Sequence, residues 1–138
     1  MVTGIHVSDE LVKEYNELKI NKKYRYIILG LNDQRNGVEL LEKGDRDKTL
    51  KDLESSLPKD NCRYVVFDFD FLTFENPPRE SNKLILILWT PDIAPIKVKV
   101  PFTGTKAEIK GSFVGISKDI LAPDFSFLDH EELRKECA

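Results

Sequence analysis

The sequence predicts an α/β (α+β) fold in which helices flank both faces of a central mixed β-sheet of about five strands. Segments with helical periodicity alternate along the chain with segments that have the composition of strands. A strand is expected over 83–89, where residues 84–89 form a continuous apolar run that is typical of a central strand covered on both faces. With 138 residues, the chain is long enough for one compact domain over 1–138 and too short for two ordinary ones.

The first half of the chain predicts a helix, a hairpin and a second helix. A helix is expected over 9–20, with Ser8 as its N-cap, because apolar residues recur there at helical spacing. Residues 24–31 are rich in β-forming types and precede, after turn signals, a short strand at 38–41. Asp47 is a candidate N-cap for the second helix.

The strand predicted at 63–71 has two distinct faces. One face carries Asp68 and Asp70, which could serve acid–base chemistry or hold a metal. No histidine, cysteine or third acid lies near them in sequence to complete such a site. We therefore expect a structural role, with both side chains solvated or bonded to the backbone. The other face is apolar and is expected in the core, as is Trp89 at the end of the next strand.

A basic strip follows Pro95. Lys97 and Lys99 alternate with apolar residues, which predicts an extended segment. A helix is expected to begin at Thr103 or Thr105, and Thr105 with Glu108 fits a capping box. Its buried side would carry Ile109, Phe113 and Ile116. Its opposite side, basic at one edge, would carry Thr103, Lys106, Ala107, Lys110, Gly111 and Val114. A short strand at 119–122 and a helix at 128–137 would close the fold.

Composition excludes several classes of function. A net charge of -3 argues against general nucleic-acid binding, which needs a strongly basic face. No apolar run is long enough to span a membrane, and the N-terminus lacks the pattern of a signal peptide, so we expect a cytosolic protein. Cys62 and Cys137 are expected as free thiols. His6 and His130 lack ligand spacing, so no metal site is expected, and the glycines form no nucleotide-binding motif.

Several different short motifs follow one another along the chain in a fixed order. They are Thr3-Gly4-Ile5, Tyr15-Asn16-Glu17-Leu18-Lys19, Tyr24-Arg25-Tyr26-Ile27, Cys62-Arg63-Tyr64, Asp68-Phe69-Asp70-Phe71, Asn82-Lys83, Trp89-Thr90-Pro91-Asp92, Ala94-Pro95-Ile96-Lys97, Lys99, Thr105-Lys106 and Val114-Gly115-Ile116. This set resembles the actin-depolymerising factor/cofilin family over nearly the whole chain. The resemblance implies a single ADF-homology (cofilin-like) domain over 1–138 that has no enzymatic activity and needs no cofactor.

The resemblance also implies the partners. Such a protein binds actin monomers and filaments, prefers ADP-bound actin, and promotes severing, depolymerisation and turnover of filaments. It is inhibited by phosphoinositides such as PIP2, acts as a monomer, and is found in the cytoplasm with the cytoskeleton. Nuclear entry is left open, because the basic cluster Lys22-Lys23-Tyr24-Arg25 is short.

The resemblance also implies two sets of site residues, which occupy the positions where the family has its actin contacts. The surface that meets both monomers and filaments would comprise Thr3, Gly4, Ile5, Lys97, Lys99, Lys106, Ala107, Lys110 and Val114. A surface used only on filaments would comprise Arg79, Lys83, Glu131, Glu132, Arg134 and Lys135. Thr3 stands where the family carries its inhibitory phosphorylation, so it is the candidate regulatory site.

The chain departs from the family pattern at several of these places. Val100, Phe102 and Ala107 replace the family's methionine, tyrosine and aspartate, and Gly111 replaces a basic residue. Ser81 stands where an arginine often precedes Asn-Lys. These departures predict weaker monomer binding than is typical. They leave open two alternatives: a coactosin-like filament side-binder with little severing, or a phosphoinositide-binding module that uses its helix lysines for headgroups.

Overall fold

The computed structural model describes residues 7–32 and 37–137. Its elements follow in the order α1 (Asp9–Lys19), β1 (Tyr24–Leu31), β2 (Val38–Asp45), α2 (Leu50–Ser56), β3 (Arg63–Leu72), β4 (Glu80–Trp89), α3 (Ile96–Ser112), β5 (Lys118–Ala122), a 3₁₀ turn η1 (Phe125–Leu128) and α4 (His130–Cys137). The predicted order of helices and strands is therefore confirmed. None of the helices in these two ranges is long and apolar enough to cross a membrane.

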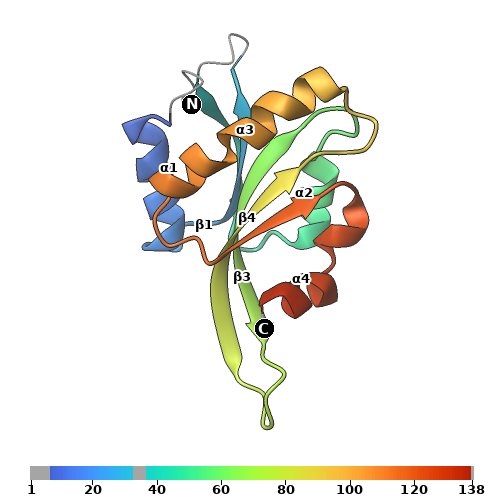
Figure 1. Cartoon of the computed structure of the whole chain (residues 1–138). Helices are drawn as coiled ribbons and strands as arrows, with labels where there is room; N and C mark the ends of the chain where they lie inside the picture. The colour runs from blue at the N-terminus through green and yellow to red at the C-terminus, as the bar shows by residue number, and fades with distance from the viewer. Residues whose placement is uncertain (1–6, 33–36, 138) are drawn as a thin grey trace.

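The strands form one five-stranded sheet in the order β2-β1-β3-β4-β5. The pairs β1–β2, β1–β3 and β3–β4 are antiparallel, whereas β4 and β5 run parallel, so the sheet is mixed as predicted. A parallel pair needs a crossover connection. Here α3 supplies that crossover, lying across the sheet in Figure 1.

Helices cover both faces of the sheet, and each face has its own core. Side chains from α1 and α3 pack with Tyr64 and Val66 of β3. On the other face, α2, η1 and α4 pack with Val65 and Phe67. This alternation confirms the two faces expected for β3. Trp89 is buried in the second core, where its indole N–H donates to the carbonyl of Pro58 at 2.7 Å.

The second helix starts later than predicted. Its N-cap is Thr49, whose hydroxyl accepts from the N–H of Asp52, while the Asp52 carboxylate accepts from the N–H of Thr49. This reciprocal pair is a capping box, and it replaces the expected cap at Asp47. The β2 strand extends to Asp45, beyond the short strand expected from the sequence, and Asp47 lies in the turn that follows it.

The largest difference concerns α3. The helix begins at Ile96 and runs through Pro101, so Lys97 and Lys99 are helical and the expected extended segment is wrong. Pro101 has no N–H and therefore removes one backbone hydrogen bond of the helix. Side-chain hydrogen bonds to backbone carbonyls stabilise the helix around this proline. Tyr64 donates its hydroxyl to the carbonyl of Phe102 at 2.5 Å.

Thr105 also lies inside α3 rather than at its start. It is fully buried, and its hydroxyl donates to the carbonyl of Pro101 at 2.7 Å. The capping box predicted for Thr105 and Glu108 is therefore wrong. The alternation of lysine with apolar residues fitted a strand, but the same residues place Val98 and Phe102 on the inner side of a helix, where they pack in the core.

The β3–β4 hairpin projects beyond the sheet (Figure 1). Its strands pair from Arg63↔Trp89 to Leu72↔Glu80. The neighbouring strands stop earlier, because β1 pairs with β3 only as far as Phe67 and β5 pairs with β4 from Ile85 onward. The outer half of the hairpin is thus a two-stranded ribbon, longer than predicted because β4 begins at Glu80.

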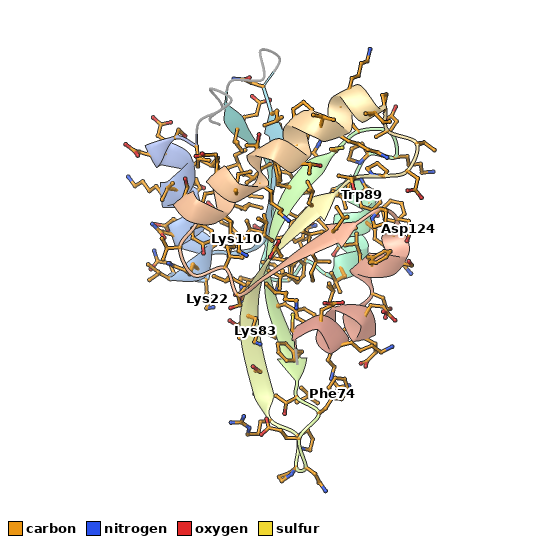
Figure 2. The ribbon with its side chains drawn as sticks, viewed as in Figure 1. Lys22, Phe74, Lys83, Trp89, Lys110 and Asp124 are labelled. Carbon is orange, nitrogen blue, oxygen red and sulfur yellow. The ribbon has the colours of Figure 1, made fainter. Side chains whose placement is uncertain are left out.

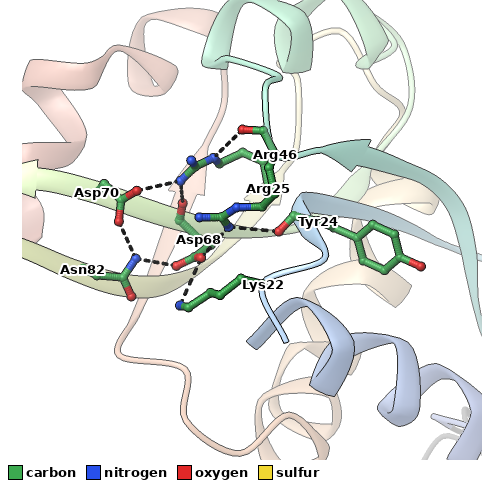
Figure 3. Close-up of polar contacts among 7 residues, drawn as sticks. All are labelled: Lys22, Tyr24, Arg25, Arg46, Asp68, Asp70 and Asn82. Atoms are coloured by element: carbon green, nitrogen blue, oxygen red, sulfur yellow. Dashed lines mark hydrogen bonds and ion pairs between the residues drawn. The ribbon is translucent and has the colours of Figure 1, made fainter. Parts of the chain in front are cut away.

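A polar cluster lies at the root of this ribbon (Figure 3). Asp68 is fully buried, and its carboxylate receives Lys22 Nζ at 3.2 Å, Arg46 Nη1 at 2.6 Å and Asn82 Nδ2 at 2.5 Å. Arg25 Nη1 binds both the Asp68 carbonyl and the Asp70 carboxylate at 2.9 Å. Asp68 is therefore ion-paired with side chains, and not solvated or backbone-bonded as expected. Within the described ranges, no group of three or more histidines, cysteines and acids could hold a metal.

Both cysteines are free and buried, as expected for thiols outside a disulfide. Burial raises the pKa of each thiol. A thiol held in its protonated form is a weak nucleophile. Cys62 and Cys137 are thus part of the two cores.

Candidate functional site

The outward side of α3 carries a stripe of apolar and small residues. At about 100° per residue, positions 96, 100, 103, 107 and 111 project within one narrow sector. Ile96 and Val100 are 76% and 62% exposed, although large aliphatic side chains are usually buried. Ala107 and Gly111 continue the stripe with minimal side chains. We call this row, with Thr103 between its two halves, the α3 stripe. It is flat enough for a partner's surface to approach the helix closely.

Lysines flank the α3 stripe. Lys99, Lys106 and Lys110 follow one edge, and Lys97 lies across the stripe from them. The sequence predicted Lys97 and Lys99 on one side of an extended segment, whereas on the helix they lie on opposite flanks of the stripe. Lys99 is half-buried, and its ammonium donates to the carbonyl of Asp92 at 3.3 Å.

Lys106 and Lys110 share one carboxylate. Their Nζ atoms each lie 2.9 Å from a separate oxygen of Asp119, which β5 places beside the helix. The hydrogen bonds from Lys106 and then Lys110 lower the pKa of Asp119 to about 2. Figure 2 shows Lys110 at the end of α3 nearest β5. Asp119 thereby joins the helix to the sheet.

Val114 lies in the turn after α3 and not in the helix. Its side chain is 70% exposed. Its carbonyl accepts from Tyr15 Oη at 2.6 Å and Lys19 Nζ at 2.8 Å. Tyr15 also stacks on Phe113 with ring centroids 4.4 Å apart, and burial raises the pKa of Tyr15 to about 12. These contacts fix α1 against the C-terminal end of α3.

The N-terminal site residues Thr3, Gly4 and Ile5 lie outside the described residues. The first described element, α1, packs in the same core as α3.

The residues predicted for a filament surface lie on the hairpin and on α4. Lys83 on β4 donates its ammonium to the carbonyl of Cys137 at the end of α4, at 2.6 Å. Arg79 lies farther along the hairpin and pairs with Glu75 at 2.8 Å. Lys135 pairs with Glu132 on the exposed side of α4 at 3.3 Å. The structure thus brings the two segments together at Lys83 (Figure 2).

Arg134 makes the most contacts in this region. Its Nε and Nη2 donate to the carbonyls of Leu72 and Thr73 at 2.5 and 3.2 Å. Its Nη1 lies 3.1 Å from Glu131, and its guanidinium lies 4.0 Å from the ring centroid of Phe74. A guanidinium has five N–H donors in a planar fork, which suits several acceptors at once. Arg134 therefore fastens α4 to the hairpin.

Three residues of these surfaces were not predicted from the sequence. Ile96 and Val100 were assigned to a strand, although helical spacing continued back through Pro101 would have placed them beside Ala107. Asp119 gave no local signal, because it meets Lys106 and Lys110 only after β5 pairs with β4.

Taken together, the fold and these surfaces are those of a protein-binding domain built around a long helix on a mixed sheet. The family model for cofilin/tropomyosin-type actin-binding proteins matches residues 4–138. The chain belongs to this cofilin/actin-depolymerising factor family.

Individual members of this family are similar to the chain over most of its length. Cofilin of Schizosaccharomyces pombe is 37% identical over 129 residues, which cover 94% of this chain and 91% of the relative. Actophorin of Acanthamoeba castellanii is 39% identical over 123 residues, 89% of this chain and 87% of that protein. The crystal structure of Streptomyces griseoflavus cofilin superposes with a TM-score of 0.86 at 29% identity, covering 97% of both chains. The resemblance inferred from short motifs is confirmed.

Proposed function

We propose that this chain binds actin monomers and filaments and promotes the severing and depolymerisation of filaments. Membership of a family of actin-binding proteins over residues 4–138 supports the partner. The single structural observation that carries the site is the exposed α3 stripe with lysines on its flanks. No step of this activity requires catalysis or a cofactor, because the work comes from the free energy of binding.

The α3 stripe is suited to a hydrophobic cleft on actin. An exposed helix face that inserts into a groove gains affinity from its apolar anchors, here Ile96 and Val100. Lys99, Lys106 and Lys110 would meet acidic groups at the rim, and such complementary charges speed association and fix orientation. Lys97, Ala107 and Val114 complete the proposed surface, together with Thr3, Gly4 and Ile5.

The hairpin and α4 would meet a neighbouring subunit of the filament. Arg79, Lys83, Glu131, Glu132, Arg134 and Lys135 are the proposed contacts. A protein that holds two adjacent subunits can shift the equilibrium of the filament only if it prefers their altered arrangement. We infer that simultaneous use of both surfaces changes the filament twist and favours severing.

Regulation and location follow from the same proposal. A phosphate on Thr3 would add about two negative charges beside an acidic partner and weaken binding. We propose a preference for ADP-bound actin, inhibition by PIP2 at the membrane surface, and a monomeric, cytoplasmic protein associated with the cytoskeleton. The lysine edge of α3 would also suit phosphate groups. The departures from the family pattern at Val100, Phe102, Ala107 and Gly111 on this helix favour a phosphoinositide-binding module as a second candidate.

Sedimentation with actin filaments tests the proposal. The chain should sediment with filaments and raise the amount of actin left in the supernatant, and it should form a complex with monomers. Filament binding without extra supernatant actin and without a monomer complex would instead identify a coactosin-like side-binder. Binding to PIP2 vesicles with no binding to actin in either form would contradict the proposal and favour the lipid-binding module.

A further inference from the structure

Asp119 contacts both Lys106 and Lys110, the two lysines at one edge of the α3 stripe. Its two carboxylate oxygens each receive one ammonium, from Lys106 and Lys110, at 2.9 Å. The lysines are separated by one helical turn on α3, and Asp119 comes from β5, a different element. Its side chain is less than one-third exposed, whereas the two lysines are more exposed.

Two free lysines one turn apart would not hold this arrangement. Like charges four residues apart on a helix repel each other. A lysine side chain also has many rotamers, and holding it in one of them at an interface costs conformational entropy. The carboxylate between them opposes the repulsion and restricts both side chains before any partner arrives.

The ion pairs with Asp119 leave N–H donors of both lysines available to a partner. Each ammonium has three N–H donors. One donor of each is directed to Asp119, and both side chains remain accessible to solvent. A partner carboxylate can therefore bind either lysine while its contact with Asp119 persists.

We propose that Asp119 is a positioning residue of the actin-binding surface, which holds Lys106 and Lys110 along the edge of the α3 stripe so that they meet acidic groups of actin with little loss of side-chain freedom. This inference rests on the proposed function. Its sign is distinctive, because simple charge counting predicts the reverse: removing an acid from a surface that binds an acidic partner should strengthen binding.

The test is the affinity of the full chain for monomeric actin, measured by titration. Asp119→Asn keeps the size of the side chain and removes its charge, and it should weaken binding about fivefold. Asp119→Glu restores a carboxylate on a longer arm and should recover most of the loss. Glu54→Gln on α2 is the matched control, since it removes one acid on the other face of the sheet and should leave affinity unchanged.

The same substitutions are then made in a chain that carries Lys106→Met and Lys110→Met. If Asp119 acts through the lysines, Asp119→Asn no longer weakens binding in that background, because coupled residues do not contribute additively. A persistent fivefold loss there would show that Asp119 acts through the fold and would overturn the inference. Equal or tighter binding of Asp119→Asn in the otherwise unchanged protein would also overturn it.

A measurement without actin separates this inference from the proposed function. Nitrogen-15 NMR of the lysine ammonium groups reports their order and their exchange with water. Asp119→Asn should make the Lys106 and Lys110 ammonium groups more mobile and faster to exchange, whether or not the chain binds actin. Unchanged ammonium signals would overturn the positioning role. Failure of the unaltered chain to bind actin would overturn the proposed function, while the ammonium signals would still show whether Asp119 orders the two lysines.

Discussion

The two proposed surfaces use charged side chains in different ways. On the α3 side, Lys106 and Lys110 contact a single carboxylate and stay open to solvent beside an exposed apolar stripe. At the hairpin, Arg134 and Lys83 donate to backbone carbonyls of other segments. The root of the hairpin is held by Asp68, a fully buried carboxylate.

This difference separates binding from stability. A charge that contacts only one neighbouring acid is available to a partner, and its loss removes little from the fold. A charge that completes the hydrogen bonds of buried or irregular backbone belongs to the fold first. We therefore expect substitutions on α3 to change actin affinity, and substitutions at the hairpin root and α4 to change stability as well.

The largest expected effect is at Asp68. Asp68→Ala removes a fully buried carboxylate that accepts from Lys22, Arg46 and Asn82, and losing these charge-assisted contacts together should cost about 3 kcal/mol of unfolding free energy. Urea denaturation measures it. Asp70→Ala is the control, because that side chain is mostly exposed and its ion pair should contribute less than about 1 kcal/mol. Equal losses for the two variants would mean that burial of Asp68 does not matter.

On the α3 stripe, the expected effect is on affinity. Val100→Asp places a charge at the centre of the proposed interface and should cost about 2 kcal/mol of binding to monomeric actin. Its unfolding free energy should stay within about 0.5 kcal/mol of the parent, because the site is exposed. Leu41→Asp, at an exposed apolar position on edge strand β2, should leave affinity unchanged. Normal affinity of Val100→Asp would move the interface away from this stripe.

Neighbouring basic residues of α4 should behave differently from each other. Arg134→Ala removes the hydrogen bonds to the Leu72 and Thr73 carbonyls and should lower the unfolding free energy by about 1.5 kcal/mol. Lys135→Ala removes only an exposed pair with Glu132 and should cost less than about 0.5 kcal/mol. Thermal or urea unfolding compares the two. If both variants are equally stable and differ only in filament affinity, Arg134 does not stabilise the fold, and the proposed difference between binding residues and stabilising residues is wrong.

The smallest effect is the pH dependence at Asp119. Its pKa falls from 3.8 to about 2 in the folded protein, so the folded state favours the ionised form. This stabilisation is complete above pH 3.8 and disappears as the pH falls through about 2. Because the site is solvated, the contribution should be about 1 kcal/mol or less. The stability difference between the parent and Asp119→Asn should therefore vanish between these pH values, and a constant difference would contradict the ion pairs.

Periodicity and short motifs determined most of the architecture. The alternation in β3 predicted which of its residues enter each core, and the spacing of apolar residues predicted α1. The ordered motifs were enough to assign the family. These signals are local, since they depend on the geometry of one strand or one helix, and a single sequence carries them in full.

The tertiary structure decided where α3 begins and what the charges do. Five residues around Lys97 and Lys99 fit a strand as well as a helix, and packing of Val98 and Phe102 against the sheet selects the helix. Arg134 and Leu72 are 62 residues apart in sequence, and Lys83 and Cys137 are 54 apart. Which charge is free for actin depends on contacts between distant segments, and no local pattern encodes such contacts.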